Sequence, residues 1–331
     1  MPRVRELETF RLTLPYGRRP ECALVKITDY GGMSGWGEIA GPCTEEVLEK
    51  TLPALIGVDW EHPSELGEIP GGTAGDMACW DLWGRMNGVP LSHALGGTRT
   101  SLIGTVRVQA DRSLESMVAR VNRHVGAGYA HVTIDVHPGW DVEPVRAVRA
   151  AYPGLAIAVD GRCAYTDITQ LEALDSYDLA AIERPCTDML TSAELQDRVN
   201  APVAVEVHSW AALDEAVSLH AGRALLLRPA KFSALGAVKA AHDRAVEAGW
   251  DIVCSGGFGA GLARAATVAV ASLPGCTLPS DVAEPPQSAQ VVVPPVGASG
   301  GVVAVPLTQP GLGHNVDEAR VRRLAKDTFH V

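Results

Sequence analysis

The sequence lacks several features that would place it in a special class of protein. No apolar run approaches the length of about 18 residues that a membrane-spanning helix needs. The segment Met1–Arg11 carries basic residues but not the apolar stretch of a secretory signal, so secretion is not expected. The seven cysteines are odd in number and widely scattered, which argues against a disulfide framework or a zinc cluster. We therefore expect a cytoplasmic protein.

Positive charge is also scarce. The chain has 28 Lys and Arg against 39 Asp and Glu, a formal net charge of −11. This balance argues against nucleic acid or an anionic membrane surface as the main partner. A small anionic substrate stays compatible with it, because local charge decides such binding. The length of 331 residues suits two domains, or one large barrel with an appendage.

Acidic residues end three successive apolar runs at equal spacing. Asp160, Glu183 and Glu206 follow one another at intervals of 23 residues, the length of one strand, one helix and two short loops. The next apolar run ends in Arg228, 22 residues further on. In a (β/α) barrel, the carboxyl ends of the strands meet at the active-site face. We therefore expect these four side chains to converge on one centre.

Two interpretations of the three acids are open. Carboxylate oxygens without a nearby Cys/His cluster suit Mg²⁺ better than zinc. The alternative is a set of structural ion pairs with arginines.

The organisation along the chain supports a barrel. Alternation predicts an antiparallel meander over Glu8–Leu14, Cys22–Tyr30 and Ser34–Ile39, and a buried helix over Thr73–Met86. From about residue 100, strands such as Val132–Val136 and Ile252–Cys254 alternate with helices, which is typical of a parallel sheet closing into a barrel. The expected helices are Asp141–Tyr152, Asp167–Tyr177, Met189–Val199, Trp210–His220, Leu235–Ala248 and a terminal one, Asp317–Ala325.

Several segments resemble one family in residue type, order and spacing. The chain resembles the enolase superfamily, in the branch of muconate lactonizing enzyme, o-succinylbenzoate synthase and N-acylamino acid racemase. The resemblance covers nearly the whole chain. The matching segments are Gly35–Glu38, Asp76–Leu82, Leu95–Gly97, Gly128-Tyr129, Pro138–Asp141, Val159-Asp160, Ile182–Pro185, Arg228-Pro229, Gly256-Gly257, Ala271–Gly275 and Pro310–Gly313.

The resemblance implies the fold class and the chemistry. It implies an α/β protein, a modified TIM barrel (β/α)7β over 98–299, with an α+β capping domain built from 1–97 plus 300–331. It also implies Mg²⁺ held by Asp160, Glu183 and Glu206, and an isomerase or lyase that abstracts a proton α to a carboxylate. A homo-oligomer is expected by family analogy only.

The sequence departs from the family at its acid/base positions. The Lys-x-Lys of the second barrel strand falls on Thr133 to Asp135, and the lysine of the sixth strand falls on Arg228. Arginine stays protonated and cannot replace a lysine base. The asparagine after the first metal ligand falls on Arg162, and the acidic residue after the seventh strand on Gly259.

Two residues could take over the proton transfer. Asp135 could act as a base if burial raised its pKa, but pairing with an arginine is the alternative. His208 replaces the last residue of the family's Asp-Glu-Ser and follows Glu206 by two positions. Histidine has a suitable pKa near neutrality, although a hydrogen-bonded loop histidine is the alternative.

Charge counting permits a metal without requiring it. Asp135 and the three strand-end acids sum to −4, and Arg162 and Arg228 return +2. One Mg²⁺ would neutralise the centre; otherwise protons or Lys231 would have to do so. We expect Arg162, Thr133 and Lys231 to contact substrate, and Asp135, His208 and Arg228 to be catalytic.

Three functions are compatible with these residues. The first is a divergent enzyme acting on a small carboxylate by isomerisation, cyclisation or elimination. The second is a non-catalytic pseudoenzyme, or a small-molecule- or partner-binding protein, on the same fold. The third, a conventional o-succinylbenzoate synthase or N-acylamino acid racemase, is disfavoured because both lysines are missing.

Overall fold

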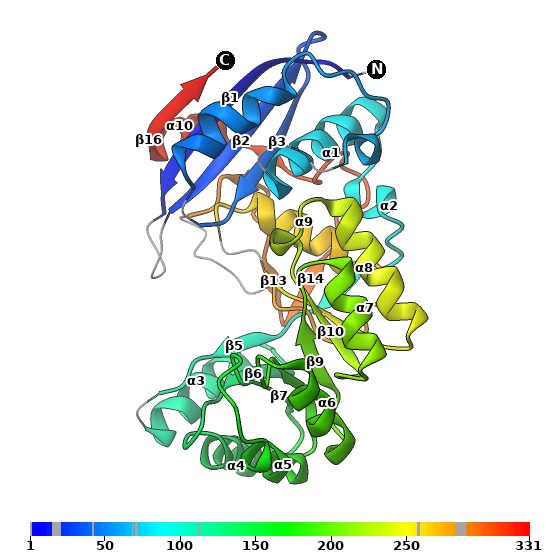
Figure 1. Cartoon of the computed structure of the whole chain (residues 1–331). Coiled ribbons are helices and arrows are strands. Elements are labelled where there is room, and N and C mark those ends of the chain that lie inside the picture. The colour runs from blue at the N-terminus through cyan, green and yellow to red at the C-terminus, as the bar shows by residue number, and fades with distance from the viewer. Residues whose placement is uncertain are drawn as a thin grey trace.

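The computed structural model describes residues 2–14, 21–41, 43–67, 69, 72–111, 113–256, 259–282 and 289–331. Gly257, one of the residues that carry the resemblance, lies outside this range. An antiparallel sheet with its helices forms one part of the molecule, and a barrel of parallel strands forms the other (Figure 1). Fold class and architecture are as the sequence predicts, whereas the domain boundaries at 97/98 and 299/300 stay a prediction.

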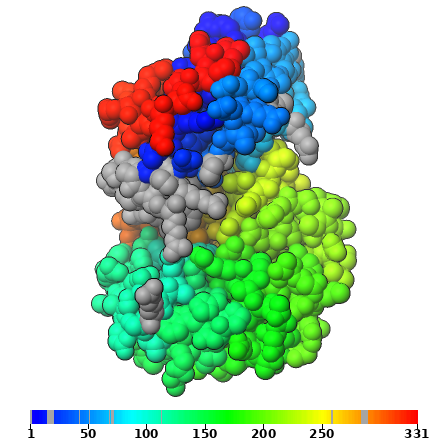
Figure 2. Space-filling model, turned by 60° about the vertical axis from the view of Figure 1, so that its left-hand side comes forward, coloured from blue at the N-terminus to red at the C-terminus, as the bar shows by residue number. Residues whose placement is uncertain are grey.

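The capping sheet joins the two ends of the chain. Its strands lie in the order β16-β1-β2-β3, with bounds β1 Val4–Thr13, β2 Glu21–Asp29, β3 Ser34–Ile39 and β16 Ala325–His330. The terminal helix is present as α10, Glu318–Leu324. The strand after it was not predicted, because its residues are polar and mostly exposed. Figure 2 shows this red C-terminal segment against the blue N-terminal strands.

Helix α1, Thr73–Asn87, lies close against β3 because glycines face it. A Cβ on Gly37 would run into the carbonyl group of Ala74, so only glycine fits there. Within the same helix, the fully buried Asp81 accepts hydrogen bonds from the backbone N–H groups of Trp36, at 2.9 Å, and Leu312, at 2.8 Å. This carboxylate therefore ties helix, sheet and C-terminal return together.

The barrel strands run parallel and follow chain order from β5 to β11. The segment after the last of them completes the ring, since Ser280 bridges Gly104 and Asp281 bridges Ser255. Four successive strands end in an acidic residue, which the pairing of the strands holds in position. The strands are β5 Val106–Val108, β6 His131–Asp135, β7 Ala156–Asp160, β8 Leu179–Glu183, β9 Val203–Glu206, β10 Ala224–Leu227 and β11 Asp251–Cys254.

Helices surround the barrel and bury their apolar faces against it. The helices predicted after residue 140 agree within one or two residues, except that Asp167–Tyr177 is divided into α5 and a short turn. The bounds are α3 Leu114–Gly126, α4 Val142–Ala151, α5 Thr169–Leu174, η4 Asp175–Tyr177, α6 Met189–Arg198, α7 Trp210–Ser218, α8 Leu235–Glu247 and α9 Leu262–Ala271.

Shorter elements complete the chain. They are η1 Glu46–Thr51, η2 Leu52–Leu55, η3 Pro63–Leu66, α2 Leu91–Ala94, β4 Ser101–Ile103, η5 Pro229–Lys231, β12 Val292–Val293, β13 Ala298–Ser299, β14 Val302–Ala304 and β15 Asn315–Val316. Within the part that the structure describes, no helix has both the length and the apolar character to cross a bilayer. The seven cysteines are free thiols.

Candidate active site at the carboxyl ends of the barrel strands

Strand register places the predicted acids at two levels. Asp135 pairs with Asp160 across β6 and β7, and Asp160 pairs with Glu183 across β7 and β8. These three carboxylates therefore stand side by side. Glu183 in turn pairs with Ala204, so Glu206 lies two residues further along its strand. The fourth acid consequently belongs to an outer level, nearer the mouth of the barrel.

At the inner level, Arg107 binds all three carboxylates. Its Nη1 donates to Oδ1 of Asp135 at 3.1 Å and to Oδ2 of Asp160, and its Nη2 donates to Oε2 of Glu183 at 3.1 Å. Its Nε lies 3.6 Å from Oδ2 of Asp281, on the segment that closes the ring. One guanidinium group thus contacts four carboxylates.

Arg107 was missed by the sequence analysis. It lies on β5, a strand of only three residues, too short to be recognised from periodicity. The available signal is an arginine between two valines. In the sheet, Arg107 pairs with Thr133, two residues before Asp135 on the same strand face. Its long side chain therefore starts one step deeper than the carboxylates and extends up to them.

At the outer level, Arg184 connects the two sets of acids. Its Nε and Nη2 donate to the carboxylate of Asp160, the first at 3.1 Å, and its Nη1 donates to Oε2 of Glu206 at 3.2 Å. Glu206 also lies 3.6 Å from Nε of Arg228 and 3.1 Å from Nε2 of His208. Asp281 and Arg184 were likewise not predicted as site residues.

Asp135 is paired with arginines on both sides. Besides its bond from Arg107, it lies 2.7 Å from Nη2 of Arg162, whose side chain is half exposed. Asp135 itself is 4% exposed. The ion pair with an arginine is thus present, and the role of Asp135 as a base stays a prediction.

Backbone strain is concentrated beside these residues. Arg162, Cys163 and Arg184 have φ angles of +52°, +58° and +44°, which non-glycine residues adopt rarely. Hydrogen bonds hold the strained loops together, for example from the N–H of Cys163 to the carbonyl of Arg184 at 2.7 Å. Such conformations cluster at functional sites because they aim side chains that regular structure cannot.

The surroundings shift the pKa values of the four acids in different directions. Burial raises the pKa of Glu183 to about 7, although the charge of Arg107 acts against this. Burial also raises the pKa of Asp135. For Asp160, burial is outweighed by the hydrogen bonds from Arg184 and the charge of Arg107, so its pKa is lowered. The pKa of Glu206 is lowered as well, because Arg228 and His208 outweigh its burial.

Arg228 carries a buried donor that is not satisfied within the described part of the chain. Among the described residues its Nε, although buried, has no hydrogen-bond partner, and the contact with Glu206 is longer than a hydrogen bond. Burial and the neighbouring arginines lower its pKa, and arginine nonetheless stays protonated. The exposed Lys231 follows in η5, three residues later.

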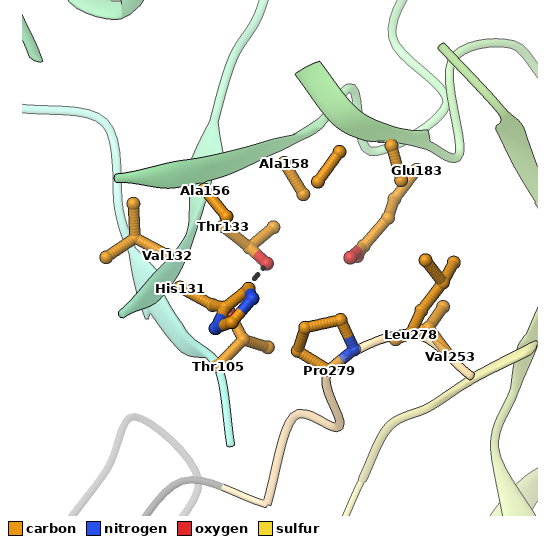
Figure 3. A pocket seen from close by; sticks show the side chains of 12 residues that line it. Thr105, His131, Val132, Thr133, Ala156, Ala158, Glu183, Val253, Leu278 and Pro279 are labelled. Atoms are coloured by element: carbon orange, nitrogen blue, oxygen red, sulfur yellow. Dashed lines mark hydrogen bonds between the residues drawn. The ribbon is translucent and has the colours of Figure 1, made fainter. Parts of the chain in front are cut away.

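Thr133 lies below this cluster, inside the barrel. It is buried, and its Oγ1 lies 3.3 Å from Oγ1 of Thr105. Figure 3 shows the hydroxyl of Thr133 and the carboxylate of Glu183 directed into one internal cavity. That cavity, with a volume of about 20 Å³, has room for a single water molecule. The predicted contact of Thr133 with substrate stays a prediction.

A larger groove, of about 490 Å³, separates the capping sheet from η5. Ile39 and Val47 of the capping part line one side, and Ala230 and Phe232 line the other. Arg228 directly precedes η5 in the chain, and its own side chain lies against Glu206 inside the barrel.

Glu38 accounts for the glycine at position 259, where the family pattern has an acidic residue. A Cβ at this position would run into the carboxylate of Glu38, whose Cδ would lie 2.7 Å from it. Glu38, from β3, accepts a hydrogen bond from the N–H of Ala260 and, at 2.8 Å, one from that of Ala263. The Glu38 carboxylate of the capping part therefore fills the space that a side chain at position 259 would need.

Comparison with known proteins identifies the family. A family model described as enolase C-terminal domain-like matches residues 116–320. The chain belongs to the enolase superfamily. It is 30% identical to o-succinylbenzoate synthase of Geobacillus stearothermophilus, over 95% of this chain and 91% of that protein. It is 31% identical to N-succinylamino acid racemase of an Amycolatopsis species, over 94% of this chain and 87% of that protein.

Solved structures of the superfamily share the fold. A member from Listeria innocua superposes with a TM-score of 0.91 at 23% identity, covering 100% of this chain and 99% of its own. A member from Roseovarius nubinhibens, solved as a complex with magnesium, gives a TM-score of 0.84 at 22% identity, covering 99% and 100%. At these identities the likeness shows the fold alone.

The described residues fit a resident Mg²⁺ poorly. Mg²⁺ requires oxygen ligands in near-octahedral geometry, whereas the oxygens of Asp160 and Glu183 here accept hydrogen bonds from Arg107 and Arg184. Among the described residues, no three His, Cys, Asp or Glu side chains form a group that could hold a metal ion. The assignment of Asp160, Glu183 and Glu206 as metal ligands stays a prediction, and we derive no chemical step through a metal.

Proposed function

We propose that this chain is a divergent enolase-superfamily enzyme that binds a small carboxylate at Arg228 and transfers a proton through His208. The observation that carries the proposal is the buried Nε of Arg228, a cationic donor that lacks a hydrogen-bond partner among the described residues. A buried, unsatisfied guanidinium donor is costly, and an incoming carboxylate would satisfy it.

His208 is the better placed of the two proton carriers. Its ring is half exposed at the mouth of the barrel, and its Nε2 is within hydrogen-bond distance of Glu206. A carboxylate that orients an imidazole is a common arrangement in general acid–base catalysis. Asp135 is buried and held by two arginines, so a substrate would have to displace them to reach it.

The arginines would supply electrostatic stabilisation. Removing a proton α to a carboxylate places negative charge on the carboxylate oxygens. Arg228, with Arg184 behind it, would stabilise that charge without first having to move into place. The predicted outcomes, isomerisation, cyclisation or elimination, share the loss of this proton and differ only in the later steps. Arg162 and Lys231 stand at the same face and would bind a second anionic group.

The groove between the capping sheet and η5 would hold the body of the substrate. Its apolar residues Ile39, Val47 and Phe232 suit a hydrocarbon portion. The names of the relatives supply probes of this kind, because N-succinylamino acids and o-succinylbenzoate both carry carboxylates on apolar bodies.

A binding experiment tests the assignment of Arg228. Isothermal titration with N-succinylamino acids would be performed on the wild type, on R228Q and on the control R146Q, which changes an exposed arginine of a surface ion pair. We expect R228Q to weaken binding at least about tenfold and R146Q to leave it unchanged. Equal affinity of the wild type and R228Q would remove the basis of the proposal.

An exchange experiment tests proton transfer. Loss of the α-proton signal of the same compounds in D₂O would be followed by NMR. We expect H208Q to slow exchange at least about a hundredfold while the binding affinity changes little. A D135N variant with the larger effect would assign the proton to Asp135 instead.

The alternative is a binding protein without turnover. It is favoured by one observation: Thr133, Asp135 and Arg228 stand at the positions of the family's lysines, so neither lysine base is present. Binding at Arg228 without exchange of any probe by the wild type would support this alternative.

A further inference from the structure

We propose that the guanidinium group of Arg107 takes the place of a divalent cation in this barrel, so that the site operates without a resident metal ion. A corollary is that removing this one side chain converts the carboxylate cluster into a divalent-cation site. The inference concerns the inner level of the cluster and does not depend on the proposed function of Arg228 and His208.

Arg107 lies among several carboxylates and contacts each of them, as a bound cation would. Its three nitrogens reach Asp135, Asp160, Glu183 and Asp281, and each acid comes from a different strand or segment of the ring. Asp160 and Glu183 are two of the three residues that the family resemblance assigns to the metal. A guanidinium that bridges them occupies the space between their oxygens, where an ion shared by both would have to lie.

Burial distinguishes this arginine from a surface partner. The side chain of Arg107 is 12% exposed, and its four acidic partners are 6% exposed or less. Four ionised carboxylates at such burial need positive charge among them, and Arg107 supplies it. Arginine suits the task because its charge is permanent and its N–H groups diverge in one plane.

Charge counting shows that Arg107 and a divalent ion are alternatives at this cluster, since the two together would make its charge positive. Counted as ionised, the five carboxylates Asp135, Asp160, Glu183, Glu206 and Asp281 give −5, and Arg107, Arg162, Arg184 and Arg228 give +4, a sum of −1. A divalent ion added to this set would make it +1. Without Arg107 the sum is −2, which one divalent ion would neutralise.

Metal titrations of the purified protein test both parts of the proposal. Mn²⁺ binding, followed by electron paramagnetic resonance, and the shift of Tm with Mg²⁺ would be measured for the wild type, R107A and R184A. R184A is the matched control, because it removes one arginine from the same cluster while Arg107 stays in place. All three proteins would first be treated with EDTA.

The expected results differ between the three proteins. The wild type and R184A should show no Mn²⁺ site tighter than about 1 mM and no rise in Tm specific to Mg²⁺. R107A should have a lower Tm in EDTA, bind one Mn²⁺, and gain several degrees in Tm with Mg²⁺. Free guanidinium ion, at low millimolar concentration, should restore part of the Tm of R107A, and NaCl should not.

Two outcomes would overturn the proposal. One is a wild-type Mn²⁺ site tighter than about 1 mM that D160N abolishes, because the ion would then coexist with Arg107 or displace it. The other is an equal gain of metal binding in R184A and R107A. If R107A cannot be purified, the wild-type titration and R107K decide: R107K keeps one charge, so it should also bind no metal. Carboxylate binding at Arg228 is measured separately, so either proposal can fail alone.

Discussion

Oε1 of Glu206 lies 3.1 Å from Nε2 of His208 and 3.6 Å from Nε of Arg228. One carboxylate oxygen therefore faces both the proposed proton carrier and the proposed anion-binding group. Glu206 orients the first and competes with substrate for the second. These two roles have opposite consequences for binding and for proton transfer, which makes them separable by experiment.

Replacing Glu206 by glutamine should separate affinity from rate. E206Q removes the charge that competes for Arg228, so we expect probe carboxylates to bind several-fold more tightly. The same change weakens the orientation of His208, so α-proton exchange should slow about tenfold or more. Titration calorimetry and exchange in D₂O measure the two effects. A purely structural role for Glu206 would instead weaken binding and exchange together.

Arg184 should be important for stability, because it bridges Asp160 and Glu206. We expect R184A to lower the free energy of unfolding by about 2 kcal/mol, since the buried Asp160 loses one of its two arginine partners. Urea denaturation measures this change. The control R146A breaks the exposed pair with Glu143 and should leave the unfolding midpoint unchanged. Similar midpoints for R184A and R146A would show that the bridge contributes little.

Asp76 should make stability depend on pH. This buried residue of α1 accepts a hydrogen bond from the N–H of Leu235, and burial raises its pKa from 3.8 to about 7. Because the folded-state pKa is the higher one, its contribution to stability is fully present below about pH 3.8 and is lost as the pH rises through about 7.

The D76N variant removes this dependence. Between about pH 4 and pH 8 we expect D76N to gain stability relative to the wild type, by up to roughly 4 kcal/mol. Denaturant unfolding at several pH values measures the difference. D59N, at a half-exposed position, is the control and should follow the wild type. A constant difference between wild type and D76N across this range would contradict the shift.

Gly259 and Glu38 should be energetically coupled. G259A places a methyl group against the Glu38 carboxylate, and we expect it to destabilise the wild type by about 1–3 kcal/mol. In the E38A background the same change should cost close to nothing, because the obstacle is gone. A double-mutant cycle in urea measures the coupling. Equal costs in both backgrounds would show that Glu38 is not the obstacle.

The repeat of strands and helices was readable from the sequence because it is local. Apolar runs ending in Asp160, Glu183 and Glu206 recur at the period of a barrel unit, and helices such as Met189–Arg198 carry their own start and stop signals. Convergence of the strand ends follows from the architecture alone. The resemblance to the enolase superfamily rested on the same ordered segments.

The partners of the acids were decided only by the tertiary structure. Arg107 comes from a strand of three residues, and Asp281 from a segment that closes the ring through single bridges, so neither carries a local pattern. The offset of Glu206 to an outer level depends on the pairing of Glu183 with Ala204, which involves two strands at once. The sequence by itself determined that four ionisable groups meet at one face. Register and ring closure determined that an arginine stands between them, because ion pairing depends on distances that no single strand sets.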